Sequence, residues 1–185
     1  MDTFDRLLLD TPRLRLRPLT VADAEALFGI FSDPPVMRYL STPPWPSIAT
    51  AHELVERDLR AMATGEYLRL GLERKDDGAL IGNCSVFNWS AQSRRAELGY
   101  TLARPAWGQG FMHEALQAVV DYAFGPMQLN RLEADIDPRN QASARSLDRL
   151  GFQLEGLLRQ RWIVAGEVSD TALYGLLHSD WAARD

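Results

Sequence analysis

The feature that most constrains the fold is a predicted strand, a turn rich in glycine and a predicted helix that follow one another over residues 94–124. Residues 94–102 alternate between apolar and polar side chains, which is typical of a half-buried strand. The helix covers 112–124, and Gly125 and Pro126 end it. Its apolar residues at helical spacing are Leu116, Val119, Val120, Ala123 and Phe124. An amphipathic helix directly after a strand predicts a helix packed on a sheet.

The turn contains two alternating glycines, Gly108 and Gly110, which let a ligand approach the backbone without obstruction by side chains. The free N–H groups and the positive dipole end of the helix favour an anion there, and a pyrophosphate is the obvious guest. Many plain strand-to-helix turns also need such glycines. Nucleotide-binding alternatives lack their signatures, because a Rossmann fingerprint needs a third glycine where His113 stands and a Walker loop needs Gly-Lys-Ser/Thr.

Alternation and helical spacing predict the other elements. Strands are predicted at 13–17, 67–74, 80–89, around 132–136, and at 153–164 and 167–177. Helices are predicted after the cap Thr20, over 47–63 with Leu54, Leu59 and Met62 inward, and over 142–150. Five prolines make 33–47 a loop with a short helical turn. The expected order is β-α-α-β-β-β-α-β-α-β-β, a mixed α/β sheet with helices on its faces, in one domain over 1–185.

Composition narrows the class of protein. The 185 residues are 46% apolar, and a net charge of −5 without a Lys/Arg-rich run disfavours a nucleic-acid binder. Cys84 is the one cysteine, which excludes a disulfide scaffold and a multi-cysteine zinc site and predicts a reducing compartment. The acidic start is unlike a signal peptide, and no stretch approaches the ~20 apolar residues of a membrane helix. We therefore expect a cytoplasmic protein without a nucleic-acid or membrane partner.

Several motifs occur in a fixed order along nearly the whole chain. They are Thr11-Pro12-Arg13-Leu14-Arg15-Leu16-Arg17, Ala96-Glu97-Leu98-Gly99-Tyr100, Trp107-Gly108-Gln109-Gly110-Phe111-Met112 with Glu114-Ala115, Asn140-Gln141-Ala142-Ser143 and Gly151-Phe152. Together they resemble the GNAT acetyltransferase superfamily, and within it the branch of ribosomal-protein N-terminal (alanine/serine) acetyltransferases. The resemblance implies a GNAT-like acyl-CoA N-acyltransferase fold, acetyl-CoA (coenzyme A) as co-substrate, no metal, and a primary amine as acceptor.

The resemblance also implies which residues bind coenzyme A. Backbone amides from Gly108 to His113 hold the pyrophosphate, Asn140 contacts the pantetheine arm, and backbone N–H groups near Tyr100 supply the oxyanion donor. Trp107 stands at the family's Gln/Arg position, as in this branch, and Met112 stands where a small residue is usual. The full expected set is Tyr100, Thr101, Leu102, Trp107, Gly108, Gln109, Gly110, Phe111, Met112, His113, Asn140, Ser143 and Arg145.

Three of the charged or reactive residues have competing interpretations. Arg145 shares a helix face with Arg149, where the pair meets the adenosine phosphates or forms a solvated charged face. His113 either touches the coenzyme or is a surface histidine. Cys84 lies in an apolar strand, which favours a packing residue over a catalytic thiol.

Acetyl transfer to an amine needs a base for the amine and a donor for the oxyanion, and often an acid for the departing thiolate. Glu97 is the candidate base, because its side of the strand also carries the small residues Gly99 and Thr101 and so leaves room for a substrate. The alternative is an exposed carboxylate paired with Arg94 or Arg95.

The usual acid of the superfamily, a tyrosine seven residues after the asparagine, is missing, since Leu147 occupies that position. By resemblance, Ser143 substitutes for it, and its hydroxyl hydrogen-bonds the sulfur and relays a proton. The alternative is that Ser143 merely caps its helix.

Arg38, Tyr39 and Trp45 lie in the proline-rich loop, which by resemblance lines the acceptor pocket; the aromatic pair equally suits anchoring of the loop to the core. The predicted function is transfer of an acetyl group from acetyl-CoA to a primary amine by direct attack in a ternary complex. The acceptor is a protein N-terminal α-amine or a small-molecule amine. The alternative is a non-catalytic acyl-CoA-binding sensor, and a homodimer stays open.

Overall fold

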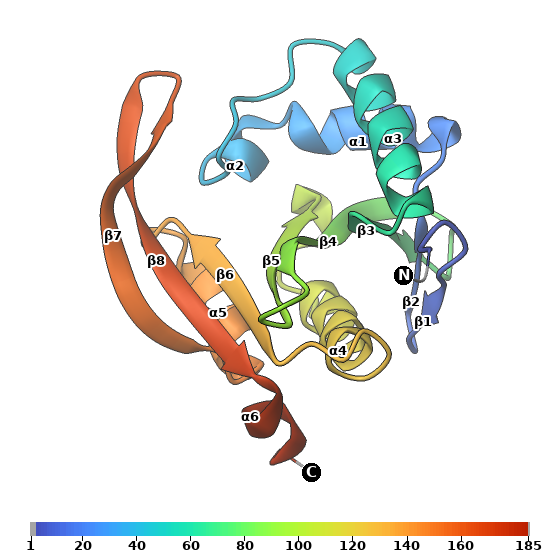
Figure 1. The fold of residues 1–185 in the computed structure, drawn as a ribbon. Coiled ribbons are helices and arrows are strands. Elements are labelled where there is room, and N and C mark those ends of the chain that lie inside the picture. The colour runs from blue at the N-terminus through green and yellow to red at the C-terminus, as the bar shows by residue number, and fades with distance from the viewer. Residues whose placement is uncertain (1–2, 185) are drawn as a thin grey trace.

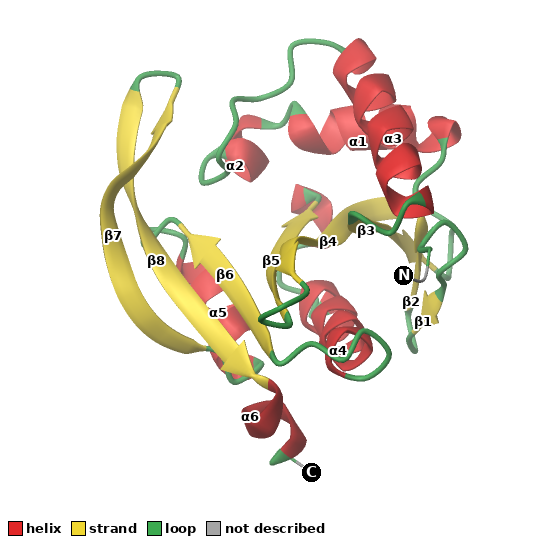
Figure 2. Ribbon diagram, viewed as in Figure 1, coloured by secondary structure: helices red, strands yellow, loops and turns green. Residues whose placement is uncertain are grey.

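The computed structural model describes residues 3–184, which form an eight-stranded mixed sheet flanked by helices (Figures 1 and 2). The strands are β1 (Leu9–Asp10), β2 (Leu14–Pro18), β3 (Leu68–Arg74), β4 (Leu80–Ser90), β5 (Arg95–Leu102), β6 (Arg131–Ile136), β7 (Gln153–Val164) and β8 (Glu167–Leu177). The α-helices are α1 (Ala24–Phe31), α2 (Pro34–Met37), α3 (Ile48–Ala63), α4 (Phe111–Phe124), α5 (Gln141–Arg149) and α6 (His178–Ala182), with 3-10 turns at Val21–Asp23 and Arg104–Ala106. The predicted mixed α/β class is confirmed.

The sheet has the strand order β1-β2-β3-β4-β5-β6-β8-β7. Strands β1 to β5 pair antiparallel in succession, and β6, β8 and β7 form a second antiparallel group. The two groups meet where β5 pairs parallel with β6. A parallel neighbour requires a crossover connection, and here α4 provides it.

Two apolar cores cover the two faces of the sheet. The larger core packs α4 and α5 against even-numbered strand residues such as Leu70, Leu98 and Leu132, and the smaller core joins α1, α2 and α3. Figure 1 accordingly shows α4 and α5 on one side of the sheet and α1 to α3 on the other. The predicted alternation of β5 is confirmed, because Ala96 and Leu98 are buried in the larger core.

The buried face of α3 agrees with the prediction at Met62 and differs from it at the other two predicted positions. Ala51, Val55 and Met62 are fully buried, whereas Leu54 and Leu59 lie half-buried at its margins. The centre of this face also carries Asp58, which forms an ion pair with Arg69 of β3 at 3.1 Å between Oδ2 and Nη1. Because the Asp58 carboxylate is paired, its charge can be buried at this position. A pattern of apolar residues does not predict a charged side chain there.

Two short elements, β1 and α6, were not predicted. Strand β1 consists of two residues and is defined by its pairing with β2, Leu9 opposite Leu16 and Asp10 opposite Arg15. Helix α6 has no buried residue, so it lacks an apolar stripe that would mark it in the sequence. The bounds of β7 and β8 agree with the prediction, and Ala165 and Gly166 turn between them at φ 48° and 85°, as a type I′ hairpin requires.

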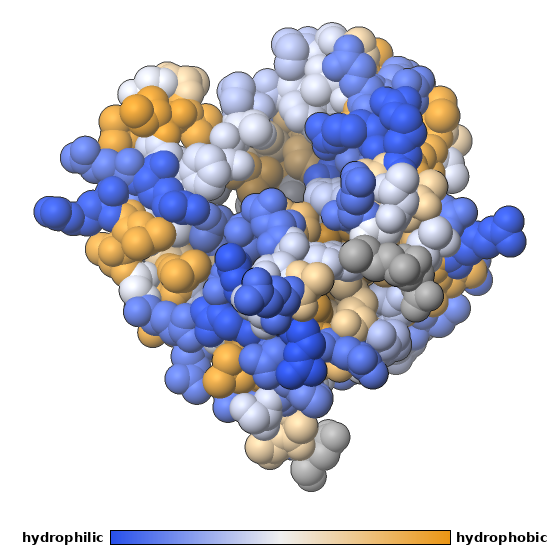
Figure 3. Space-filling view, in the orientation of Figure 1, coloured by the Kyte–Doolittle hydropathy of each residue, from blue (hydrophilic) through white to orange (hydrophobic). Residues whose placement is uncertain are grey.

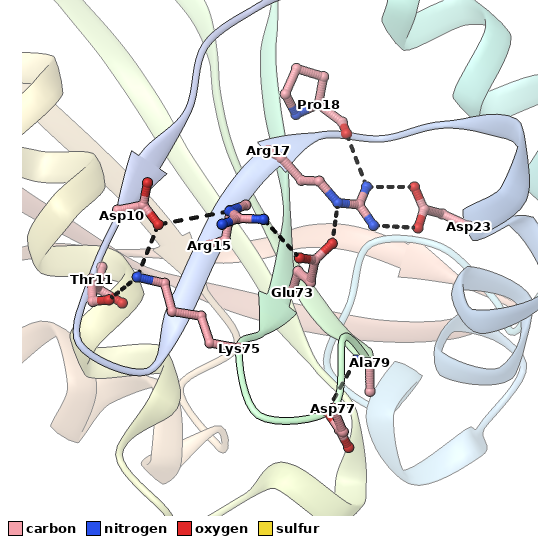
Figure 4. Close-up of polar contacts among 10 residues, drawn as sticks. All are labelled: Asp10, Thr11, Arg15, Arg17, Pro18, Asp23, Glu73, Lys75, Asp77 and Ala79. Atoms are coloured by element: carbon pink, nitrogen blue, oxygen red, sulfur yellow. Dashed lines mark hydrogen bonds and ion pairs between the residues drawn. The ribbon is translucent and has the colours of Figure 1, made fainter.

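Hydrogen bonds and ion pairs connect β1, β2 and β3 (Figure 4). Arg17 of β2 donates two hydrogen bonds of 2.8 Å to Asp23 and one of 2.6 Å to Glu73 of β3. The carboxylate of Asp23 also accepts from the Thr20 amide at 2.7 Å and thereby closes the first helical turn at the predicted cap. Lys75 reaches Asp10 of β1 at 2.9 Å. Across residues 3–184, no helix combines the length and apolarity needed to cross a membrane.

Candidate active site

The parallel ladder between β5 and β6 is short. Within the described chain it holds three residue pairs, Arg95 with Arg131, Ala96 with Leu132, and Glu97 with Glu133. Beyond these pairs β5 continues to Leu102 beside β4, and β6 continues to Ile136 beside β8. The two strands therefore part after Glu97, and an opening bordered by residues 98–102 and 134–136 lies in the middle of the sheet.

The glycine turn lies between the end of β5 and the start of α4. Gly108 and Gly110 have φ angles of 73° and 81°, values that favour glycine, and Gly110 is the N-cap of α4. The first amides of α4 have no partner within the helix, so they are available to an anion. Trp107 Nε1 donates to the Leu102 carbonyl at 2.8 Å and fixes the turn against β5.

Arg13, directly before β2, supports the turn from outside. Its Nη1 donates to the Gln109 carbonyl at 2.9 Å, and its Nε donates to Glu114 of α4 at 2.6 Å. The Arg13 guanidinium also lies 4.4 Å from the centre of the Phe111 ring. The alternating pattern of residues 13–17 indicated a strand but not this contact, because its partners lie about a hundred residues away.

The first side chains of α4 point into the protein. Phe111 and Met112 are buried in the larger core, where Met112 Sδ lies 3.7 Å from the Sγ of Cys84. The core therefore accommodates the bulk of Met112 at the family's small-residue position. His113 is half-buried, and burial, followed by repulsion from Arg149 and Arg184, lowers its pKa. The His113 Nδ1 atom is buried without a hydrogen-bond partner among the described residues.

Helix α5 brings Asn140 and Ser143 to the opening. Asn140 is the N-cap, and its side-chain oxygen accepts from the Ser143 amide at 3.1 Å. The cap is thus Asn140, which differs from the alternative in which the Ser143 hydroxyl caps the helix. The Ser143 hydroxyl instead lies 2.6 Å from the Tyr100 hydroxyl of β5. Arg145 and Arg149 are exposed on the same helix.

Glu97 lies on the other face of the sheet from Tyr100, because the two are three residues apart on one strand. Asn88 Nδ2 donates to Glu97 Oε1 at 3.2 Å. Arg95 pairs with Glu133 at 2.9 Å, which differs from the alternative in which Glu97 takes that arginine. The pairing of β5 with β6 ends at Glu97, so the opening begins directly beyond this residue.

Strand β6 adds carboxylates to the Glu97 face, a feature that the sequence prediction missed. Leu132 and Ala134 are buried against the helices, so Glu133 and Asp135 face the Glu97 side by alternation. Glu133 is neutralised by Arg95 and Arg131 at 2.9 and 2.8 Å. Asp135 has a weaker ion pair, 3.7 Å to Arg161 of β7. Burial raises the pKa of Asp135 and outweighs the opposing effect of Arg161.

The proline-rich loop approaches the same end of β6. The Tyr39 ring lies 5.2 Å from the Arg38 guanidinium and 5.8 Å from that of Arg139, which follows β6. Trp45 stacks on Phe31 of α1 at 4.4 Å between ring centres, a geometry that anchors the loop to the helices. Figure 3 shows a hollow between the β7–β8 hairpin and α1 to α3, with apolar atoms at its floor.

Comparisons with known proteins identify this arrangement. A family model described as an acetyltransferase (GNAT) domain matches residues 13–153. The chain belongs to this family. The uncharacterised N-acetyltransferase p20 of Bacillus licheniformis is 35% identical to the GNAT chain over 174 residues, which cover 94% of this chain and 98% of that protein.

Two further relatives of this GNAT protein carry more specific names. The [ribosomal protein uS5]-alanine N-acetyltransferase of Escherichia coli is 32% identical over 118 residues, 63% of this chain and 61% of that enzyme. The structure of Mycobacterium smegmatis RimJ in complex with CoA-disulfide superposes with a TM-score of 0.84 and 25% identity, over 96% of this chain and 90% of that one. The chain is an acetyltransferase whose relatives include ribosomal-protein acetyltransferases.

Cys84 has no access to a substrate in this GNAT domain. The side chain is 1% exposed, and burial raises the pKa of its thiol. A neutral, enclosed thiol is a poor nucleophile. Among residues 3–184, no group of three or more His, Cys, Asp or Glu side chains is arranged to hold a metal ion.

Proposed function

We propose that this GNAT enzyme transfers an acetyl group from acetyl-CoA to a primary amine by direct attack at the opening between β5 and β6. The observation that carries the proposal is the position of the glycine turn, which places the N-terminus of α4 next to the point where the two strands part. A phosphate site beside a gap between strands suits a ligand that has a pyrophosphate at one end and an extended arm.

The residues of the turn fit the phosphate end of coenzyme A. The amides at the start of α4 receive its pyrophosphate, and the positive φ angles of Gly108 and Gly110 direct the backbone toward it. Arg13 fixes the Gln109 carbonyl and so holds the turn in this conformation. The backbone near Tyr100 supplies hydrogen bonds to the arm and to the oxyanion. Exposed Arg145 lies beside the expected path of the adenosine phosphates.

Glu97 is the proposed base. Its carboxylate accepts a hydrogen bond from a neutral donor, Asn88, and lies on the face of the sheet opposite α4 and α5, where the acceptor would lie. The carboxylate accepts a proton from the attacking ammonium, directly or through water, so that a neutral amine reaches the thioester. Ser143, on the opposite face, is the proposed partner of the departing sulfur.

The charge of the Glu97 face favours a cationic acceptor. Asp135 lies two residues beyond the last β5–β6 pair, which is about 7 Å along the strand, and its ion pair with Arg161 is long, at 3.7 Å. An ammonium beside Glu97 and Asp135 would compensate both carboxylates. A protein N-terminal α-amine or a small-molecule amine meets this requirement, and the name of the Escherichia coli relative supports the former.

The test is thiol release from acetyl-CoA with a panel of amines that includes peptides beginning with alanine or serine and small polyamines. We expect turnover on at least one amine, and a Glu97→Gln variant should lower kcat by about 100-fold or more with little change in the KM for acetyl-CoA. Glu53→Gln on the exposed side of α3 is the matched control and should retain full activity.

Two results would contradict the proposal. Binding of coenzyme A without turnover on any amine would favour a non-catalytic sensor. A larger rise in melting temperature with ATP or NAD than with coenzyme A would instead favour a nucleotide-dependent enzyme.

A further inference from the structure

Two side-chain hydroxyl groups form a hydrogen bond on the α4–α5 side of the opening in the sheet. Tyr100 extends from β5, on one side of the opening, and Ser143 lies in the first turn of α5, which follows β6 on the other side. Their oxygens are 2.6 Å apart, which is the distance of a short hydrogen bond, and either group can be the donor. Leu147, one turn further along α5, is fully buried and has no polar atom to offer.

Each of the two hydroxyls carries one proton. Once an anion binds beside Ser143, these two protons determine the direction of both hydrogen bonds. One proton lies in the hydrogen bond between the oxygens, and the other is free to point elsewhere. When an acceptor lies next to Ser143, the Ser143 hydroxyl donates its hydrogen bond to that acceptor. Tyr100 must then donate its own hydrogen bond to Ser143. The Ser143 amide is already bonded to Asn140, which leaves the hydroxyl as the mobile group.

Tyr100 is suited to donate and unsuited to lose its proton. Burial is the main cause that raises the pKa of its hydroxyl, and the hydrogen bond with Ser143 offsets this only in part. A phenol with such a pKa stays neutral at the pH at which enzymes work. Serine hydroxyls are still weaker acids, and a free thiol has a pKa of about 8.5. Neither hydroxyl can therefore hand a proton to a thiolate at low cost.

We propose that Tyr100 and Ser143 form a hydrogen-bond chain that ends on the departing sulfur, with Tyr100 as the positioning residue. This inference rests on the proposed function, because it places the sulfur beside Ser143. It changes the predicted role of Ser143 from a proton relay to a donor that stabilises a thiolate. Tyr100 of β5 thus donates to the serine, which in turn donates to the sulfur. On α5, Leu147 occupies the position of the usual tyrosine acid and cannot donate.

The departure of the coenzyme A thiolate needs no general acid in this scheme. When the tetrahedral intermediate collapses, the C–S bond breaks and its electron pair stays on the sulfur, while Ser143 Oγ–H and Tyr100 O–H keep their protons. The thiolate takes a proton later from water, and the proton of the amine leaves through Glu97. Hydrogen bonds to a charged acceptor are stronger than those to a neutral one, so the chain favours departure of the thiolate over the bound thioester.

The first test measures the pKa of the coenzyme A thiol when bound to the intact protein, from the ultraviolet absorbance of the thiolate during a pH titration. We expect the bound thiol to have a pKa about one unit below that of free coenzyme A. Tyr100→Phe should abolish most of this shift, and so should Ser143→Ala. An unshifted thiol in the wild type would overturn the proposal, and so would a shift that survives Tyr100→Phe.

The second test is kinetic. Tyr100→Phe should lower kcat about 10-fold with little change in the KM for acetyl-CoA, and the double variant with Ser143→Ala should be no slower than Ser143→Ala alone. Multiplying losses in the double variant would contradict a single chain. Equal melting temperatures exclude a general loss of fold.

The outcomes of the two tests distinguish failure of this inference from failure of the proposed function on which it rests. If no amine supports turnover, the proposed function fails, while the thiol titration still decides the hydrogen-bond chain. If the wild type turns over and Tyr100→Phe keeps both its kcat and the thiol shift, the chain fails and the function stands. The kcat of the wild type should also show no decline that is due to Tyr100 up to about pH 10, because its phenol stays protonated there.

Discussion

Arg13 Nε donates to Glu114 Oε2 at 2.6 Å and thereby connects the start of β2 with the first turn of α4. The same carboxylate accepts 2.6 and 2.7 Å hydrogen bonds from the Thr11 hydroxyl and the Arg13 amide. Glu114 therefore joins the strand that enters the sheet to the helix that carries the glycine turn. Its charge also suits the positive end of that helix.

Glu114→Gln should destabilise the protein by about 1–2 kcal/mol at neutral pH. Burial acts to raise the pKa of Glu114, but hydrogen bonds from Thr11 and Arg13 outweigh it and hold that pKa below its ordinary 4.5. A carboxylate with a lowered folded pKa stabilises the protein above its unfolded pKa, and that stability is lost as the pH falls through the folded value. Denaturant unfolding at pH 7 and at acid pH should show the two proteins converging at low pH. A constant difference would contradict this interpretation, and Glu53→Gln serves as control.

Gly110→Ala should reduce both stability and affinity for coenzyme A. At φ 81° an alanine costs about 1–2 kcal/mol, and its Cβ would lie 3.4 Å from Arg13 Nη2. Gly29→Ala is the matched control, because Gly29 lies inside α1 with nothing within 4 Å of an added Cβ. That control should gain about 0.5–1 kcal/mol. Melting curves with and without coenzyme A measure both effects, and an unaffected Gly110→Ala protein would refute the role of this turn.

Asp135→Asn should raise the KM for a cationic acceptor about 10-fold, equivalent to about 1.4 kcal/mol, with little change in the KM for acetyl-CoA. The reason is the loss of a half-buried negative charge on the face of the sheet that carries Glu97. Asp5→Asn, an exposed change before β1, should have no effect. Steady-state kinetics at saturating acetyl-CoA provide the comparison. Equal acceptor KM values in Asp135→Asn and the wild type would remove Asp135 from the acceptor site.

Cys84 should be inert toward thiol reagents in the folded protein and reactive after unfolding. Burial raises the pKa of its thiol, and a neutral thiol without access to solvent reacts slowly. Cys84→Ala should keep its kcat while losing about 1 kcal/mol of stability through lost packing against Met112. A loss of turnover in Cys84→Ala with an unchanged melting temperature would instead assign chemistry to this residue.

Local pattern predicted much of the fold because the relevant signals lie within a few residues of each other. The hairpin of β7 and β8 follows from alternation on both sides of Ala165 and Gly166, and α4 follows from its apolar stripe. The face of α3 was displaced because Asp58 occupies its buried centre. That position is tolerable because Arg57 on the same helix and Arg69, on a later strand, supply counter-charges.

The candidate site residues came from the sequence and the resemblance, and their roles stay predictions, whereas the contacts that the structure shows among them were not predicted. Alternation correctly placed Tyr100 with Leu98 on the helix side of β5, but its hydroxyl partner Ser143 lies 43 positions away in the chain. The parting of β5 and β6 and the carboxylate of Asp135 depend on pairings between distant strands. A single sequence holds no local signal for such contacts.

The short β5–β6 ladder leaves two sheet edges in the interior of the molecule. Edge strands usually lie at the rim of a sheet, where charges or prolines discourage another strand from pairing with them. Here residues 98–102 and 134–136 border a gap, and an extended guest with amide groups of its own would take the place of the missing strand. The protein forgoes the stability of a continuous sheet at this point. Saturation with coenzyme A should therefore protect the backbone amides of both edges from hydrogen exchange together.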